Sequence, residues 1–129
     1  MKVLYTLLFI SLFTNCGTKS AQMVLSEDTP YKGNWILTKK SRGITGTNVE
    51  LKKVFELQID NDVINYYENS KLVLTKPFKT TKGKTIQSTD SLNVMIGNTI
   101  PKQSIQLHND QLIITDQCYD CFTYIYKRK

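Results

Sequence analysis

The chain has 129 residues, enough for one domain of ordinary size, and its apolar content of 40% argues against a globally disordered protein. The formal charge of +6 falls to +5 without Lys2, and the lysines are spread along the chain rather than clustered. No RNP-like or helix-turn-helix pattern accompanies them, so we expect no nucleic-acid partner. Such a mild excess serves solubility in most proteins, and attraction to anionic headgroups is the alternative.

Residues 1–15, MKVLYTLLFISLFTN, have the pattern of a signal peptide. Lys2 precedes an apolar run of about 11 residues, whereas a membrane-spanning helix needs about 20. The run is therefore too short to remain as a membrane anchor.

The sequence LFTNCG around Cys16 resembles the lipobox of bacterial lipoproteins. This resemblance implies cleavage before Cys16, acylation of its thiol and new amine with chains such as palmitate, and attachment to the lipid bilayer of the cell envelope. An ordinary secreted protein with a stray cysteine is the alternative. Gly17–Ser20 lacks the acidic residues that follow the lipidated cysteine in surface-exported lipoproteins, which favours a periplasm-facing position.

Residues 16–30 are small and polar, have no clear period and end at Pro30, which is typical of a tether. A short N-terminal element around Met23–Leu25 is the alternative for part of this segment.

Residues 31–129 show apolar positions with a period of two and turn residues about every ten positions. No convincing helical stripe interrupts them. This pattern predicts an all-β domain, a small antiparallel meander of about eight strands. Closure into a β-barrel is expected because it removes the unpaired edges of the sheet.

Two hairpins are specified most clearly, around Asn61-Asp62 and Asn109-Asp110. In each, a two-residue turn sets apolar side chains opposite one another. The predicted facing pairs are Ile59–Ile64, Leu57–Tyr66, Leu107–Leu112 and Ile105–Ile114.

The segment YKGNWIL, residues 31–37, resembles the Gly-x-Trp signature on the first strand of lipocalins, and the chain ends with the basic residues Lys127–Lys129. The chain is shorter than a full lipocalin and lacks that family's Thr-Asp-Tyr loop motif, so the resemblance is to the smaller bacterial lipocalin-like, or calycin-like, domains. It implies that Trp35 closes one end of the barrel and that Arg128 stacks on it as a cation–π pair. An ordinary core aromatic is the other interpretation of Trp35.

Cys118 and Cys121 form a C-x-x-C motif between two predicted strands. A thioredoxin-type redox pair normally begins a helix, and a zinc site needs two further ligands. A structural disulfide bond that clips the final hairpin is therefore favoured, because residues i and i+3 of a turn lie within bridging distance. Of two registers for this hairpin, a five-residue loop that sets Ile114 against Tyr124 is preferred, since it buries the aromatic rings.

We expect no catalytic residues, metal or cofactor. His108 lies beside a turn without an evident nucleophile, and Asp60-Asn61-Asp62 lacks the glycine and glutamate of a calcium loop. No acid, base and nucleophile set emerges, so the protein is not expected to be an enzyme.

Two functions remain. The first is a membrane-anchored lipoprotein that binds a small apolar or amphipathic ligand inside the barrel, and a cavity of at least about 300 Å³ enclosed by the barrel would favour it. The second is a structural or interaction protein of the cell envelope, with a solid core and a protein partner. The residues expected to line the interior in either case are Phe55, Leu57, Tyr66, Leu74, Val94, Ile105, Leu107, Ile114 and Tyr124.

Overall fold

The computed structural model describes residues 29–86, 88–95 and 101–129. The predicted signal peptide, Cys16 and nearly all of the predicted tether lie outside these residues. Among the described residues, no helix has the length and apolar character needed to cross a membrane.

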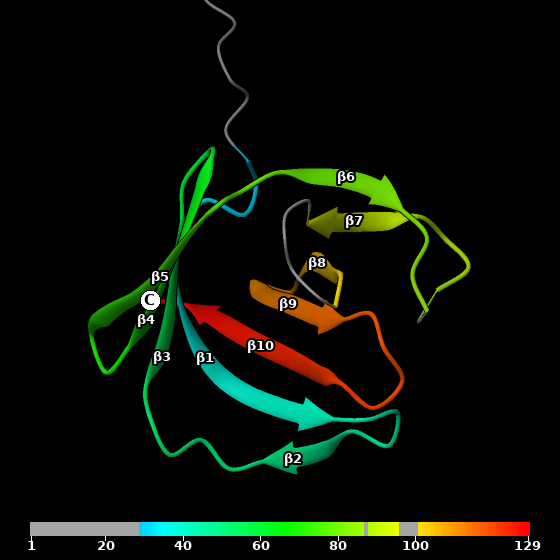
Figure 1. Cartoon of the computed structure of the whole chain (residues 1–129), viewed down its shortest axis with the longest axis horizontal. Helices are drawn as coiled ribbons and strands as arrows, with labels where there is room; N and C mark the ends of the chain where they lie inside the picture. The colour runs from blue at the N-terminus through cyan, green and yellow to red at the C-terminus, as the bar shows by residue number, and fades with distance from the viewer. Residues whose placement is uncertain (1–28, 87, 96–100) are drawn as a thin grey trace, which may run out of the picture.

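The described chain is all-β, with ten strands in one antiparallel sheet (Figure 1). The strands are β1 (Gly33–Arg42), β2 (Thr47–Val49), β3 (Phe55–Ile59), β4 (Val63–Glu68), β5 (Lys71–Pro77), β6 (Thr80–Gly83), β7 (Leu92–Met95), β8 (Gln103–His108), β9 (Gln111–Asp116) and β10 (Phe122–Arg128).

The sheet follows the order β5-β4-β3-β1-β10-β9-β8-β7-β6, with β2 paired to β1 outside this path. The last strand therefore pairs with the first. β3 pairs with β1 although β2 lies between them in the chain, and every other neighbour pair consists of consecutive strands. The sheet curls through 216° into a half-barrel and does not close. The prediction of a closed barrel of about eight strands was wrong in both closure and strand number.

The opening lies between β5 and β6, which follow one another in the chain but occupy opposite ends of the sheet. Pro77 ends β5, and Phe78 then turns into the core, where it is only 3% exposed and packs edge-on against Tyr31. The Phe78 N–H donates to the carbonyl of Asp62 at 2.8 Å. Because Phe78 is fixed in the core, the chain crosses over instead of turning back along β5.

The two hairpins have the predicted registers. Asn109 and Asp110 both have positive φ angles, 47° and 60°, as expected for the type I′ turn that suits a two-residue hairpin. The β9–β10 hairpin has the preferred five-residue loop, with Ile114 opposite Tyr124.

The core fills one end of the half-barrel. Trp35 is fully buried there, and its indole N–H donates to the Tyr31 carbonyl at 2.9 Å. Tyr31 reaches across to β8, where its hydroxyl contacts the Ile105 carbonyl at 3.4 Å. Apolar residues from seven strands, and Phe78 from the crossover, pack around this pair, so that end of the half-barrel is solid.

Candidate functional site

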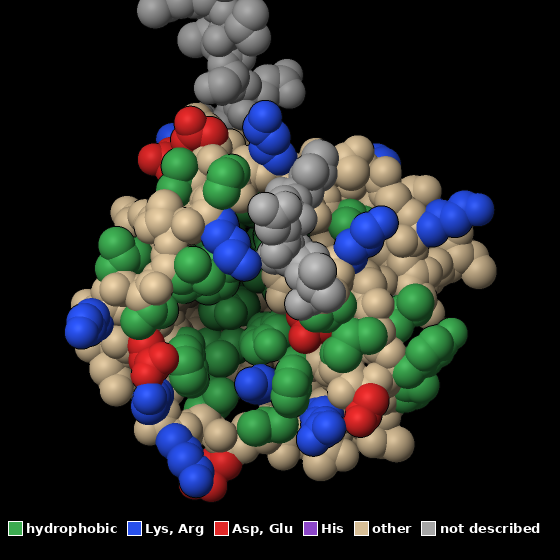
Figure 2. All heavy atoms as spheres, viewed as in Figure 1, with side chains coloured by type: hydrophobic (Ala, Val, Ile, Leu, Met, Phe, Trp, Pro, Cys, Tyr) green, Lys and Arg blue, Asp and Glu red, His purple; other side chains and the backbone are tan. Residues whose placement is uncertain are grey.

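A pocket of about 350 Å³ lies beside the core. Seven strands contribute to its wall, which means that it occupies the concave face of the sheet. Figure 2 shows a hollow with hydrophobic side chains in its wall and several basic side chains around it. The lining residues are Leu37, Lys40, Phe55, Tyr66, Tyr67, Glu68, Val73, Leu74, Gln103, Ile114, Tyr124 and Tyr126.

The pocket and the core share part of their surface. Leu37, Ile114 and Tyr126 belong to the buried core cluster and also line the pocket. The core is therefore the floor of the pocket, and the pocket is open to solvent rather than fully enclosed by a barrel.

A β-bulge in β1 determines that Lys40 lies in this pocket. Leu37 is opposite Tyr126, but the register shifts before Lys39, and Lys40 is then opposite Tyr124. Since side chains alternate along a strand, regular pairing from Leu37 would turn Lys39 inward and Lys40 outward. The extra residue, Thr38, is held by a hydrogen bond from its hydroxyl to the Ile125 carbonyl at 3.0 Å. The bulge thus turns Lys40 toward the pocket and Lys39 toward the outer face of the sheet.

Lys40 contacts aromatic rings rather than a carboxylate. Its Nζ lies 4.1 Å from the ring centre of Phe122 and 5.4 Å from that of Tyr124. Within the described part of the chain, Lys40 forms no salt bridge. Cation–π contacts stabilise an ammonium through its side facing the rings and leave other N–H groups available to a ligand.

Three tyrosines bring phenol groups to the same wall. Burial raises the pKa of Tyr66, and burial with the charge of Asp116 and the proximity of Tyr66 raises the pKa of Tyr124 to about 12. Burial chiefly raises the pKa of Tyr126 as well. All three phenols therefore stay protonated at neutral pH and can donate hydrogen bonds. None of their hydroxyls has a hydrogen-bond partner among the described residues.

A second bulge lies in the β4–β5 pair. Tyr66 is opposite Leu74 and Tyr67 is opposite Leu72, so Val73 is the extra residue. Val73 and Leu74 consequently both line the pocket, next to the free edge of β5. Bulges are common beside functional sites, where they re-aim side chains. Both of these bulges adjoin the same pocket.

The acids near the pocket already have partners. Glu68 lines the pocket and pairs with Lys53. Asp116 accepts hydrogen bonds from the Gln103 side chain at 2.8 Å and from the Phe122 N–H at 3.3 Å. The negative charges at this wall therefore have partners, and Lys40 pairs with no acid in the part of the chain that the structure describes.

The nine residues predicted to line the interior divide into two groups. Phe55, Tyr66, Leu74, Ile114 and Tyr124 line the pocket. The other four do not line it: Leu57 and Ile105 lie in the solid core, Val94 is buried beside β6, and Leu107 is 39% exposed near the end of β8.

Arg128 lies over the indole of Trp35, with its guanidinium carbon 4.3 Å from the ring centre. Its Nη1 donates to the Lys32 carbonyl at 3.0 Å. Gly33 makes room for this arrangement, because a Cβ there would lie 2.6 Å from Arg128 Nη1, and its φ of +143° favours glycine. The pair joins the first and last strands at the solid end of the half-barrel.

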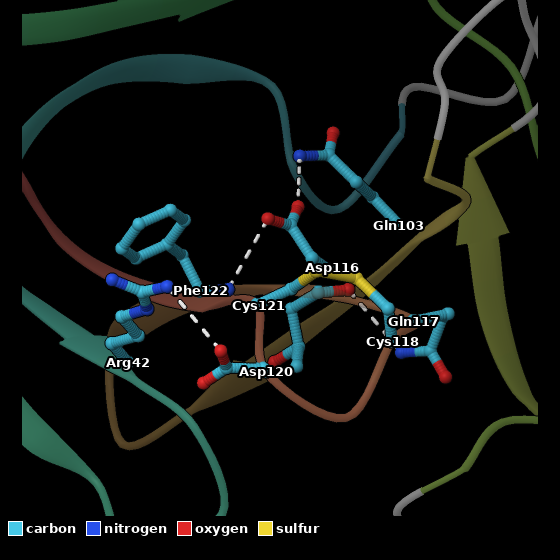
Figure 3. The surroundings of a disulfide bond; sticks show 9 residues. Arg42, Gln103, Asp116, Gln117, Cys118, Asp120, Cys121 and Phe122 are labelled. Carbon is cyan, nitrogen blue, oxygen red and sulfur yellow. Dashed lines mark hydrogen bonds and ion pairs between the residues drawn. A yellow bond between two sulfur atoms is a disulfide. The ribbon is translucent and has the colours of Figure 1, made fainter.

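Cys118 and Cys121 form a disulfide bond, with their Cα atoms 5.4 Å apart (Figure 3). The loop that carries it is tied to the β1–β2 turn. The Gly43 N–H donates to the Cys121 carbonyl at 2.9 Å, and Arg42 pairs with Asp120 at 3.3 Å. These contacts place the bridge at the end of the half-barrel opposite Trp35.

A hollow of about 440 Å³ lies beside this disulfide. Its wall is made largely of loop residues, including Ile44 and Tyr119, which are 84% and 73% exposed. A wall of exposed loop residues buries less of a ligand's surface than the concave face of a sheet does. His108 is exposed beside Asn109, and no cluster of metal-ligating side chains occurs in the ranges described.

No protein-family model, curated protein or solved structure matches this chain. The chain is an all-β antiparallel half-barrel with a pocket on its concave face.

Proposed function

We propose that the protein is a lipid-anchored, lipocalin-like binding module that takes a small apolar or amphipathic molecule into the concave face of its sheet. The observation that carries this proposal is the pocket of about 350 Å³ between the core and the opening of the half-barrel. Ligand pockets in proteins have volumes of about 300–1,000 Å³ and mainly apolar walls with a few polar groups. This pocket combines both features.

The pairing of the first and last strands supports the lipocalin-like assignment, and so does the stacking of Arg128 on Trp35. The sheet lacks the β5–β6 pairing that a closed barrel would have, and its curl stops at 216°. The opening gives a ligand access to the pocket from the side of β5.

A pair of substitutions on β5 tests the binding function. Leu74 and Leu72 are 44% and 51% exposed, but only Leu74 lines the pocket. Leu74→Trp places a large ring in the pocket, whereas Leu72→Trp adds the same ring nearby and is the matched control. We expect one molecule of the neutral fluorescent probe N-phenylnaphthylamine to bind per full-length chain, and Leu74→Trp to weaken binding about 10-fold or more.

Leu72→Trp should change the affinity about twofold at most. Absence of probe binding to the unaltered protein, or equal effects of the two substitutions, would contradict the binding function.

The membrane anchor rests on the lipobox-like sequence at Cys16 and on the apolar segment before it. Native mass spectrometry of protein extracted from membranes tests it. We expect the mass of a mature chain that begins at Cys16, carries acyl groups and retains its ligand. In a separate fractionation of the cell, we expect the protein to face the periplasm. An unacylated chain that retains Met1 would refute the anchor without affecting the pocket.

One observation favours a second function, an interaction protein of the cell envelope. The free edge strand β5 exposes Leu72, Val73 and Leu74 in succession, and an edge of this kind can pair with a strand of another protein. Stoichiometric co-purification of an envelope protein that is lost in Val73→Pro would support this alternative.

A further inference from the structure

We infer that the pocket selects amphiphiles with an anionic head group, and that Lys40 and the Tyr124 hydroxyl bind that head. This inference rests on the proposed binding function and names the chemistry that the site recognises.

Lys40 enters the pocket because of the bulge in β1. Strand alternation alone would leave Lys40 on the outer face, and the Thr38 bulge turns it into the pocket. A charged side chain brought into a largely apolar concave face is costly unless it gains a partner. No described residue supplies a carboxylate to Lys40, so a negatively charged group of the ligand would form the ion pair with its ammonium.

Hydrogen-bond donors lie beside Lys40 in the pocket wall. Lys40 Nζ lies 5.4 Å from the ring centre of Tyr124, and Tyr66, Tyr124 and Tyr126 line the same pocket, the last two on one face of β10. Their hydroxyls have no protein partner in the described ranges. An ammonium and neighbouring phenol hydroxyls form a donor-rich wall, which suits the oxygen atoms of a carboxylate, sulfate or phosphate head.

The pocket also has an apolar part. Leu37, Phe55 and Ile114 line it together with the β5 residues Val73 and Leu74. A volume of about 350 Å³ suits a single flexible chain better than a large rigid ring system. The free edge of β5 adjoins this apolar wall, so a longer tail can leave the pocket there.

The charge at the opening agrees with the same ligand class. Five lysines and no acid occur between Lys71 and Lys84, the segment that forms the two free edges. None of these lysines forms a salt bridge with a described residue. Lysines protect sheet edges from pairing, and here they also create a positive potential around the entrance to the pocket.

The test compares three amphiphiles with twelve-carbon chains and different heads, each below its critical micelle concentration. These are dodecanoate, neutral monododecanoylglycerol and dodecyltrimethylammonium, titrated calorimetrically into the full-length protein. We expect dodecanoate to bind about 10-fold or more tightly than the cationic amphiphile, because its carboxylate is attracted to Lys40 and accepts hydrogen bonds, whereas the trimethylammonium head is repelled by Lys40 and offers no acceptor.

Lys40→Met removes the charge and keeps most of the apolar stem, and Lys39→Met is the matched control on the outer face of the same strand. Lys40→Met should abolish the preference for dodecanoate and leave the neutral amphiphile bound, while Lys39→Met preserves the preference. Tyr124→Phe should weaken dodecanoate binding several-fold with little effect on the neutral amphiphile.

Equal affinity for the three heads, or a preference that survives Lys40→Met, would overturn the head-group inference while leaving the pocket as an apolar binding site. Failure of all three amphiphiles to bind would overturn the binding function together with the inference. Far-UV circular dichroism of each variant establishes that the comparison is made on folded protein.

Discussion

Replacing Trp35 by phenylalanine tests the contact that joins the first strand to the last. Trp35 is fully buried, its indole N–H donates to the Tyr31 carbonyl at 2.9 Å, and Arg128 lies 4.3 Å above its ring. Phenylalanine leaves the Tyr31 carbonyl without its donor, which costs about 1–3 kcal/mol in a buried position. The smaller ring also loses packing and part of the cation–π attraction, so we expect a total loss of about 2–4 kcal/mol.

Urea denaturation followed by far-UV circular dichroism measures this loss, since the variant has no tryptophan left to report by fluorescence. Arg128→Met should cost about 1 kcal/mol, and Lys127→Met, on the outer face of the same strand, is its control. In a double-mutant cycle, Trp35→Phe and Arg128→Met should show a coupling of about 0.5–1 kcal/mol. A Trp35→Phe cost below about 1 kcal/mol, or no coupling, would refute the joint role of this pair.

Three further predictions concern the disulfide, a glycine and the phenols. Replacing Cys118 and Cys121 by serine should lower the free energy of unfolding by about 2 kcal/mol without unfolding the sheet, because so short a loop restricts the unfolded chain only a little; a loss above about 5 kcal/mol in urea titration would contradict this. Gly33→Ala should destabilise the fold by about 1–3 kcal/mol, since the new Cβ meets Arg128 and the positive φ is strained; an unchanged urea midpoint would contradict it. The raised pKa of Tyr124 means that its contribution to stability is complete below the ordinary tyrosine pKa of 10.0 and is lost as pH rises through about 12. Thermal unfolding measured across that range should show a falling midpoint, and Tyr124→Phe should reduce the slope; equal slopes would count against the burial of this phenol.

The hairpins could be predicted because they depend on local information. Asn-Asp pairs favour two-residue turns, and only one register sets Leu57 against Tyr66 or Ile105 against Ile114. The C-x-x-C spacing likewise restricted the final loop, where the disulfide and the five-residue connection both occur.

The opening of the sheet could not be predicted in the same way. It depends on where Phe78 packs, and Phe78 packs against Tyr31, which is distant in sequence. Alternation of apolar and polar residues along β5 and β6 is compatible both with hydrogen bonding between these two strands and with their separation at opposite ends of the sheet. Pro77 was the one local signal, because proline is restricted to edges and ends of strands.

The pocket was predicted only in part, because its key features come from bulges. The sequence around Thr38 contains no glycine or other mark of a bulge, and strict alternation places Lys39, not Lys40, beside Leu37. Tyr126 lies two residues after Tyr124 on β10 and therefore faces the same side of the sheet. Its presence in the pocket wall could have been predicted from the preferred register of the last hairpin. Leu107 was assigned to the interior from its facing pair, but it lies near the end of its strand, where little covers it.

Nuclear Overhauser effects between the full-length protein and bound dodecanoate test the central claim most directly. If the concave face is the binding site, the methylene protons of the ligand contact Leu37, Phe55 and Ile114, and the protons next to the carboxylate contact Lys40 and Tyr124. Contacts confined to the exposed Ile44 and Tyr119 side chains, or to the outer face of the sheet, would contradict it.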